Sequence, residues 1–245
     1  MKLLSITWSY SDESNFKDSV LYKSFIKKNN EKDFINVHFN RNNYKDLEIT
    51  FEQKFGYQYE FILYKIHLLK KELEKLSGDD IVYADTNDVV CLIDIKTIQY
   101  EGGVIFSSEK NKYPSDNSSW FPKTNYPQWN LDNSIYLNSG LIITSISQYL
   151  ELIKIVEEKI LSLEYKNFGG DQGVYTYYYM NEFKPEIKLD YETKLFLSTY
   201  LTSTDRFEKV GDRLRNKITN TFPAFIHDNG WNYGSPRFIE NFDLK

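Results

Sequence analysis

The chain has 245 residues, with 30 basic and 35 acidic side chains and a formal net charge of −5. That length suits one domain better than two, and a hydrophobic content of 41% is enough for a sizeable core. The acidic balance and the lack of a long basic run argue against nucleic acid as a partner, because a phosphate backbone is bound by clustered Lys and Arg. With one cysteine, Cys91, the chain can form neither an internal disulfide nor a cysteine-based zinc site.

The apolar run at the N-terminus is too short for a signal peptide, and no stretch approaches the length of a membrane span. These features predict a soluble protein of a reducing compartment, the cytoplasm. The Asn- and Lys-rich composition hints at an AT-rich microbial or viral genome, and thus at a microbial or viral-host cytosol. No pattern in the sequence specifies an oligomeric state.

Strand and helix patterns alternate through about the first 165 residues. Short apolar runs that end at polar residues predict strands at 3–8, 34–39, 81–84, 103–108 and 140–145. Apolar residues at helical spacing predict helices at 16–29, 62–76 and 147–163, with a helical turn near 95–99. This alternation is typical of an α/β fold with a mostly parallel central sheet flanked by helices.

The second half of the chain is less regular. Residues 109–134 combine three prolines with two tryptophans, which predicts a long ordered loop rather than a linker. Beyond it the patterns predict a helix at 171–183, short strands within 186–199 and 206–219, and a last strand at 223–227 before a glycine-rich tail. In a mostly parallel sheet, ligands bind beyond the carboxyl ends of the strands. This rule selects 7–12, 85–88, 107–109 and 227–230 as candidate binding segments.

The segment IVYADTNDVV (81–90) sets two acids, Asp85 and Asp88, directly after a buried-type strand. Two carboxylates this close repel each other unless a cation lies between them. Carboxylate oxygens suit Mg²⁺ or Mn²⁺. The alternative is an ordinary turn, in which Asp and Asn side chains cap their own backbone. The pattern by itself leaves both interpretations open.

The chain has three histidines. His38 falls within an expected strand and His67 within the long helix, so both have a simple structural interpretation. His227 ends the last strand and precedes an Asp-Asn-Gly tripeptide. A strand-end imidazole can join two carboxylates around a metal, and Mn²⁺ accepts that mixed set. The alternative is the surface or packing role that histidine commonly has.

Two other polar segments stand out. Asp171 follows Gly169 and Gly170 at an expected helix start, where the helix dipole favours an anion. An N-cap is the commoner role of Asp there, although a cap does not require the glycine pair. Asn138 and Ser139 lie between an apolar dipeptide and a buried-type strand. Their polar groups therefore either satisfy the backbone or meet a polar ligand.

Seven segments in chain order resemble the glycosyltransferase domain of the procollagen lysyl hydroxylases and the related collagen glycosyltransferases. They are YKIHLLKKEL (64–73), IVYADTNDVV (81–90), GVIFSSEKNKYP (103–114), YLNSGLIITS (136–145), DQGVYTYYY (171–179), LDYETKLF (189–196) and PAFIHDNG (223–230). No single segment is specific, but all seven fall in the family's order. The resemblance implies a single GT-A domain over 1–245. A Rossmann-like nucleotide-binding half would cover about 1–108, and about 109–245 would shape the acceptor site and supply the metal-binding histidine.

The resemblance also implies an activity: metal-dependent transfer of a hexose, glucose or galactose, from a UDP-sugar to a hydroxyl acceptor. The acceptor would be hydroxylysine of a collagen-like protein, or a glycan. Asp85, Asp88 and His227 match the family's metal-binding residues, here expected to hold Mn²⁺ or Mg²⁺. Asp171 matches the last acid of a cluster linked to catalysis. With Gln172 it is expected at the reacting sugar, as base in an inverting enzyme or as an orienting group in a retaining one.

The remaining expected contacts divide between the two ends of the donor. Nucleotide contacts are expected from Thr7, Trp8, Ser9, Lys65, Asn87, Asn229 and Gly230, and sugar or acceptor contacts from Asn138, Ser139, Asp171 and Trp120.

The chain departs from the family pattern at two places. Gly169 and Gly170 occupy positions of the acidic cluster, and Tyr233 stands where the family has a Lys, so Lys65 or Arg237 is the expected substitute at the diphosphate. These departures keep open a non-catalytic nucleotide-sugar or glycan-binding module. A metal-dependent phosphohydrolase is a further alternative. It leaves the YLNSG and Gly-Gly-Asp-Gln segments without a role.

Overall fold

The computed structural model describes residues 1–9, 14–40, 57–76, 78, 80–110, 136–161, 171–181, 187–229 and 237–244. Its helices are α1 (Val20–Ile26), α2 (Tyr57–Leu73), α3 (Ile146–Leu161), α4 (Asp171–Asn181) and α5 (Phe238–Asn241). Its strands are β1 (Lys2–Ser9), β2 (Phe34–Asn40), β3 (Asp80–Asp85), β4 (Val89–Cys91), β5 (Val104–Glu109), β6 (Tyr136–Ser145), β7 (Ile187–Asp190), β8 (Phe196–Ser198), β9 (Phe207–Val210), β10 (Arg213–Asn216) and β11 (Phe225–His227).

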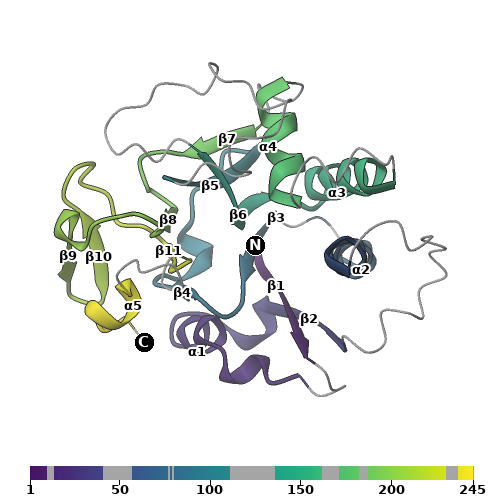
Figure 1. Cartoon of the computed structure of the whole chain (residues 1–245). Coiled ribbons are helices and arrows are strands. Elements are labelled where there is room, and N and C mark those ends of the chain that lie inside the picture. Colours follow the sequence, from purple (N-terminus) through teal and green to yellow (C-terminus); the bar gives the residue numbers. More distant parts are fainter. Residues whose placement is uncertain are drawn as a thin grey trace.

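A six-stranded sheet with the order β2-β1-β3-β6-β5-β7 forms the centre of the molecule (Figure 1). β1 pairs in parallel with β2 and β3, and β5 pairs in parallel with β7. Within this sheet as described, β6 alone runs antiparallel to its neighbours β3 and β5. The expected mostly parallel α/β architecture is confirmed. This sheet and the smaller sheet β4-β11-β8 both contain strands from either side of residue 108.

Helices and a second sheet cover the two faces of the central sheet. α2, α3 and α4 pack on one face, and α1 with the β4-β11-β8 sheet packs on the other (Figure 1). Successive residues of β3 divide between these layers: Ile81 and Tyr83 join the α2–α4 core, whereas Val82 and Ala84 join the α1 core. Because both faces are buried, such strands read in the sequence as continuous apolar runs.

The expected elements are present with shifted ends. The helix expected at 16–29 is a 3-10 turn (Phe16–Asp18) followed by the shorter α1, because Ser19 is extended and its hydroxyl accepts the Tyr22 N–H as an N-cap. Two elements were not expected. β4, with three residues, is too short to show a periodicity, and it is defined by its pairing with β11. α5 lies in the expected tail, where Asp228 accepts the N–H groups of Phe238 and Ile239.

The strand expected at 140–145 begins at Tyr136, and its extra residues carry an irregularity. On β5, Phe106 pairs with Ile142 but Ser107 pairs with Asn138, so residues 139–141 of β6 have no partner on β5. Bulges of this kind re-aim side chains. Because β6 is antiparallel, its N-terminal end lies at the sheet edge where β3 and β5 end. Asn138 therefore meets residues from the carboxyl ends of its neighbours.

None of the described helices combines the length and apolar character that crossing a membrane requires.

A buried carboxylate links the central sheet to the smaller sheet and provides a test of the fold. Asp190 accepts the N–H groups of Lys194, Leu195 and Phe196 at 3.0, 2.6 and 2.8 Å. Asp190→Ala leaves these three donors without their acceptor, so we expect the free energy of unfolding to fall by about 3 kcal/mol in urea denaturation. The control is Glu192→Ala in the same turn, whose carboxylate pairs with exposed Lys194 and is expected to cost less than about 1 kcal/mol. Equal losses in the two variants would contradict this account.

Candidate active site

The two acids at the end of β3 lie beside the histidine that ends β11. His227 Nε2 is 3.4 Å from Asp88 Oδ1 and 3.8 Å from Asp85 Oδ2. The pairing of β11 with β4 explains this proximity, because His227 is in register with Val89, directly after the acidic turn. The imidazole is 5% exposed, whereas the side chains of Asp85 and Asp88 are 40% and 28% exposed. The histidine is thus fixed in the interior, and the acids reach solvent.

The second ring nitrogen of His227 fixes the orientation of the imidazole. Nδ1 lies 3.1 Å from Asn138 Oδ1, which also accepts the Gly140 N–H at 3.0 Å. An amide oxygen only accepts hydrogen bonds, so Nδ1 carries a hydrogen and donates it. Nε2 is therefore directed at the two carboxylates. Histidines that bind metals are commonly oriented by such a hydrogen bond from the opposite nitrogen.

The opposite charges of His227 and the two acids change the pKa values of all three groups. Burial lowers the pKa of His227, but Asp88 and Asp85 outweigh burial and raise that pKa to about 9. Burial raises the pKa of Asp88, yet His227 brings it below its ordinary value. The pKa of Asp85 stays raised, mainly because the groups packed around its carboxyl displace water although part of the side chain reaches solvent; Lys65 and His227 oppose the shift. A protonated His227 shared by two acids supplies positive charge where a cation would lie.

The three side chains have the chemistry of a divalent-metal site. Within the described chain, no three His, Cys, Asp or Glu side chains already surround a metal-sized space. Two carboxylates and one imidazole nitrogen are nevertheless a donor set that suits Mn²⁺, and carboxylates suit Mg²⁺. Nε2 lies within 4 Å of an oxygen of each acid, and both acids are partly exposed, so the three potential donors lie close to one another.

Gly140 makes the approach of these groups possible. A Cβ atom at this position would lie 2.2 Å from His227 Cε1 and 2.9 Å from Asp85 Oδ2. Any side chain would therefore push His227 and Asp85 away from β6. Sequence reasoning missed this role: Gly140 lies in the YLNSG segment, but the need for a missing side chain is visible only when β11 is placed against β6.

Glu109 is a further residue of the candidate site that sequence reasoning did not single out. This carboxylate at the end of β5 is buried, and it accepts hydrogen bonds from the amides of Asn138, Asn229 and Gln172 at 3.1, 2.9 and 2.9 Å. Gln172 in turn accepts the N–H and hydroxyl of Ser139. One carboxylate thus joins β5, β6, α4 and the residues after β11. The strand-end rule did select 107–109, but it did not distinguish Glu109.

Asp171 and Lys65 form an ion pair between α4 and α2. Lys65 Nζ lies 3.0 Å from Asp171 Oδ2, and the two side chains are 17% and 19% exposed. Nζ also lies 5.3 Å from the centre of the Tyr83 ring, whose hydroxyl donates to Asp85 Oδ1. Burial lowers the pKa of Lys65, but Asp171, Tyr83 and Asp85 together hold it well above its ordinary value. The ammonium group therefore carries a positive charge between two of the predicted site acids.

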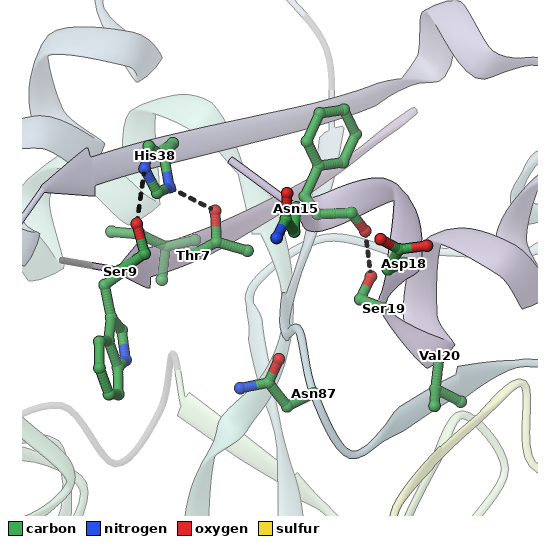
Figure 2. A pocket seen from close by; sticks show the side chains of 11 residues that line it. Thr7, Ser9, Asn15, Asp18, Ser19, Val20, His38 and Asn87 are labelled. Atoms are coloured by element: carbon green, nitrogen blue, oxygen red, sulfur yellow. Dashed lines mark hydrogen bonds between the residues drawn. The ribbon is translucent and has the colours of Figure 1, made fainter. Parts of the chain in front are cut away.

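A pocket of about 480 Å³ lies beside the turn between the two acids (Figure 2). Its lining comes from β1, β2, the segment before α1 and the acidic turn: Ile6, Thr7, Trp8, Ser9, Asn15, Phe16, Asp18, Ser19, Val20, His38 and Asn87. Four predicted nucleotide contacts are thereby brought together, namely Thr7, Trp8, Ser9 and Asn87. The described lining holds no Lys or Arg. His38, interpreted from the sequence as structural, also faces this pocket.

The other predicted residues lie elsewhere. Asn229 braces Glu109 and accepts the Tyr200 N–H, and it does not line the pocket. Arg237 pairs with Glu240 at the surface. Trp120, Gly230, Gly169, Gly170 and Tyr233 lie outside the described residues.

The family model described as the PLOD GT domain matches residues 62–242, about three quarters of the chain. The chain belongs to this family. The match spans the elements from α2 to α5 that carry the acids, Gly140 and His227, so the resemblance noted in the sequence is confirmed. None of the curated protein sequences matches the chain.

Two solved structures show the fold of this PLOD-type domain. A glycosyltransferase involved in the glycosylation of the major capsid of PBCV-1 is 12% identical, with a TM-score of 0.50 and 94% of each chain covered. Mouse xyloside xylosyltransferase 1 in its apo form is 13% identical, with a TM-score of 0.51, covering 93% of this chain and 97% of that one. The similarity confirms the expected single-domain GT-A fold.

Substitution of Gly140 tests the close approach of His227 to β6. We expect Gly140→Ala to displace the imidazole and to lower the free energy of unfolding by about 1–3 kcal/mol, because a Cβ atom overlaps the ring. Urea denaturation and the NMR signals of the His227 ring measure the two effects. Gly211→Ala is the control. Its added Cβ atom meets nothing within 4 Å, and the only expected cost comes from the backbone φ of +64° at Gly211. Unshifted ring signals in Gly140→Ala would rule out the proposed crowding.

The shared proton on His227 predicts a pH dependence of stability without metal. The pKa of this group is about 9 in the folded state against 6.5 in the unfolded state, so protonation favours folding. We compare the free energy of unfolding of the wild type with that of His227→Gln in EDTA. The stabilisation that the protonated histidine gives the wild type is expected to be complete below pH 6.5. On the order of 3 kcal/mol of it should be lost as the pH rises through 9. Urea denaturation of both proteins at several pH values measures this difference in unfolding free energy. A difference that stays constant or grows with pH would contradict the shared proton on His227.

Proposed function

We propose that this glycosyltransferase domain moves a hexose, glucose or galactose, from a UDP-sugar to a hydroxyl acceptor, with Mn²⁺ or Mg²⁺ held by Asp85, Asp88 and His227. The observation that carries the proposal is the position of Asn87. It lies in the turn between the two acids and also lines the adjacent pocket, which holds no described cation. A nucleoside diphosphate has its parts in the same order, an uncharged nucleoside followed by charged phosphates.

The two ends of the donor would meet different groups of the chain. The nucleoside would occupy the pocket and contact Thr7, Trp8, Ser9 and Asn87. The metal would supply positive charge that stabilises the leaving diphosphate. Lys65 is a cation on the α2 side that interacts with Asp85, and its ammonium group would add to that charge.

The reacting sugar would lie between β6 and the start of α4. Gln172 is held by Glu109 and Ser139, so its amide position is fixed before the donor binds. Asp171 is held by Lys65 at the first residue of α4. Its carboxylate would accept the proton of the acceptor hydroxyl if the reaction inverts, or orient the sugar if it retains.

The acceptor we propose is hydroxylysine of a collagen-like protein or a hydroxyl of a glycan. Membership of the PLOD GT domain family supports the first. The similarity to an enzyme that acts in capsid glycosylation supports a viral or microbial glycoprotein instead. Both acceptors present the same chemistry, a hydroxyl nucleophile.

The activity is tested by UDP release from UDP-glucose and UDP-galactose with Mn²⁺, with and without EDTA. We expect metal-dependent release that falls at least about 100-fold in Asp85→Asn and Asp88→Asn, because each substitution removes a charged metal ligand. Asp80→Asn, at the opposite end of β3, is the control and should retain activity.

Three other outcomes would replace the proposal. UDP binding without turnover of any nucleotide sugar would indicate a non-catalytic binding module. Phosphate release from simple phosphoesters would indicate a phosphohydrolase. Full activity in EDTA would remove the metal from the mechanism.

A further inference from the structure

Tyr83 is a buried tyrosine whose hydroxyl contacts one of the acids of the candidate site. It lies two positions before Asp85 on β3, and successive side chains of a strand alternate between the two faces of the sheet. Tyr83 and Asp85 therefore leave the strand on the same face, the one that α2, α3 and α4 cover. Tyr83 is 1% exposed, and its hydroxyl donates to Asp85 Oδ1 at 3.1 Å.

The ring of Tyr83 is fixed by its neighbours. It packs on the ring of Tyr149 from α3, with the two ring centres 5.9 Å apart. Lys65 Nζ lies 5.3 Å from the centre of the Tyr83 ring. Both tyrosines belong to the apolar core between the central sheet and helices α2, α3 and α4. A side chain enclosed in a close-packed core keeps one rotamer, so the Tyr83 hydroxyl is a donor with a fixed position.

The carboxylate of Asp85 depends on such a donor for its orientation. The torsion that turns an aspartate carboxylate about its Cβ–Cγ bond has a broad distribution. The Asp85 side chain is also 40% exposed, so packing alone does not hold it. The hydrogen bond from Tyr83 to Oδ1 leaves the other oxygen, Oδ2, directed at His227, whose Nε2 is 3.8 Å away. Oδ2 is also the oxygen for which Gly140 leaves room.

The choice of acceptor separates this hydrogen bond from one that only satisfies a buried hydroxyl. A tyrosine hydroxyl in a core needs an acceptor, and a backbone carbonyl would serve equally well. The acceptor here is instead a partly exposed carboxylate beside His227. We propose that Tyr83 is a positioning residue: its hydroxyl holds Asp85 with Oδ2 toward His227, and this orientation sets the affinity of the domain for Mn²⁺. The inference rests on the proposed function.

Tyr83→Phe tests the role of the hydroxyl, because it keeps the ring beside the Lys65 ammonium group. Electron paramagnetic resonance measures free Mn²⁺ during a titration in the presence of UDP. We expect Mn²⁺ affinity to fall about tenfold, since removal of a group that orients a metal ligand commonly weakens metal binding to this extent. The matched control is Tyr149→Phe, which removes a hydroxyl from a buried tyrosine of the same core. Its Mn²⁺ affinity should stay within about twofold of the wild type, because no site acid loses a hydrogen bond.

Turnover provides a second signature of positioning. In Tyr83→Phe, the Mn²⁺ concentration for half-maximal UDP release from the UDP-sugar should rise about tenfold. Because the ion binds by mass action, saturating Mn²⁺ should restore the maximal rate to within about threefold of the wild type. A loss of turnover that no Mn²⁺ concentration restores would place Tyr83 in the reaction step and overturn the inference.

The remaining outcomes also decide the question. Unchanged Mn²⁺ affinity in Tyr83→Phe overturns the inference, and so does an equal loss in Tyr149→Phe, which would assign the effect to core packing. A wild type that binds no Mn²⁺ in the presence of UDP overturns the proposed function as well, which separates the two failures.

A measurement on the wild type takes the place of Tyr83→Phe if that variant does not fold. The carbon NMR signal of Tyr83 Cζ should shift when Mg²⁺ is added to the UDP-bound protein, because the hydroxyl is bonded to an acid that would bind the ion. The Cζ signal of Tyr149 should stay in place. A Tyr83 signal that does not move, or that moves no more than the Tyr149 signal, contradicts the inference.

Discussion

The site depends on one imidazole held between two carboxylates. His227 contacts Asp88 and Asp85 through Nε2 while Asn138 fixes its other nitrogen. Two acids this close at a strand end would repel each other, and the histidine removes that repulsion as long as it is protonated. The metal ion that we propose would take the place of this proton, with the two carboxylates and the imidazole as its donors. The absence of a side chain at Gly140 permits the contact.

The neighbouring carboxylates, Glu109 and Asp171, each have hydrogen-bond or ion-pair partners. Glu109 is a carboxylate with three amide donors and a favourable charge interaction with His227, whereas Asp171 is neutralised by Lys65. Burying a charge is costly unless it is paired or fully hydrogen-bonded, so these partners hold one another in fixed positions. In the proposed mechanism, polar groups held in this way would require little reorganisation when the substrate binds.

The acidic turn separates two regions of different character. On the α1 side, the pocket around His38 offers hydroxyls, amides and an indole, which suit an uncharged ring. On the α2–α4 side, Lys65, Asp171 and Glu109 form a charged and buried network, which suits the reacting groups. Asn87 marks the boundary, since it belongs to the turn and also lines the pocket. A donor with a nucleoside at one end and a sugar at the other spans such a boundary.

The sequence by itself determined the α/β class and the positions of the acids and of His227 at strand ends, because these features follow from local periodicity and from residue type. It also selected the YLNSG segment, since polar residues beside a buried strand are unusual. Only the tertiary structure decided that Gly140 must lack a side chain, that Glu109 joins three amides and that His38 faces a pocket. Each of these depends on which strands become neighbours. Strand pairing brings together residues as distant in the chain as Val89 and His227, and no local pattern records such a pairing.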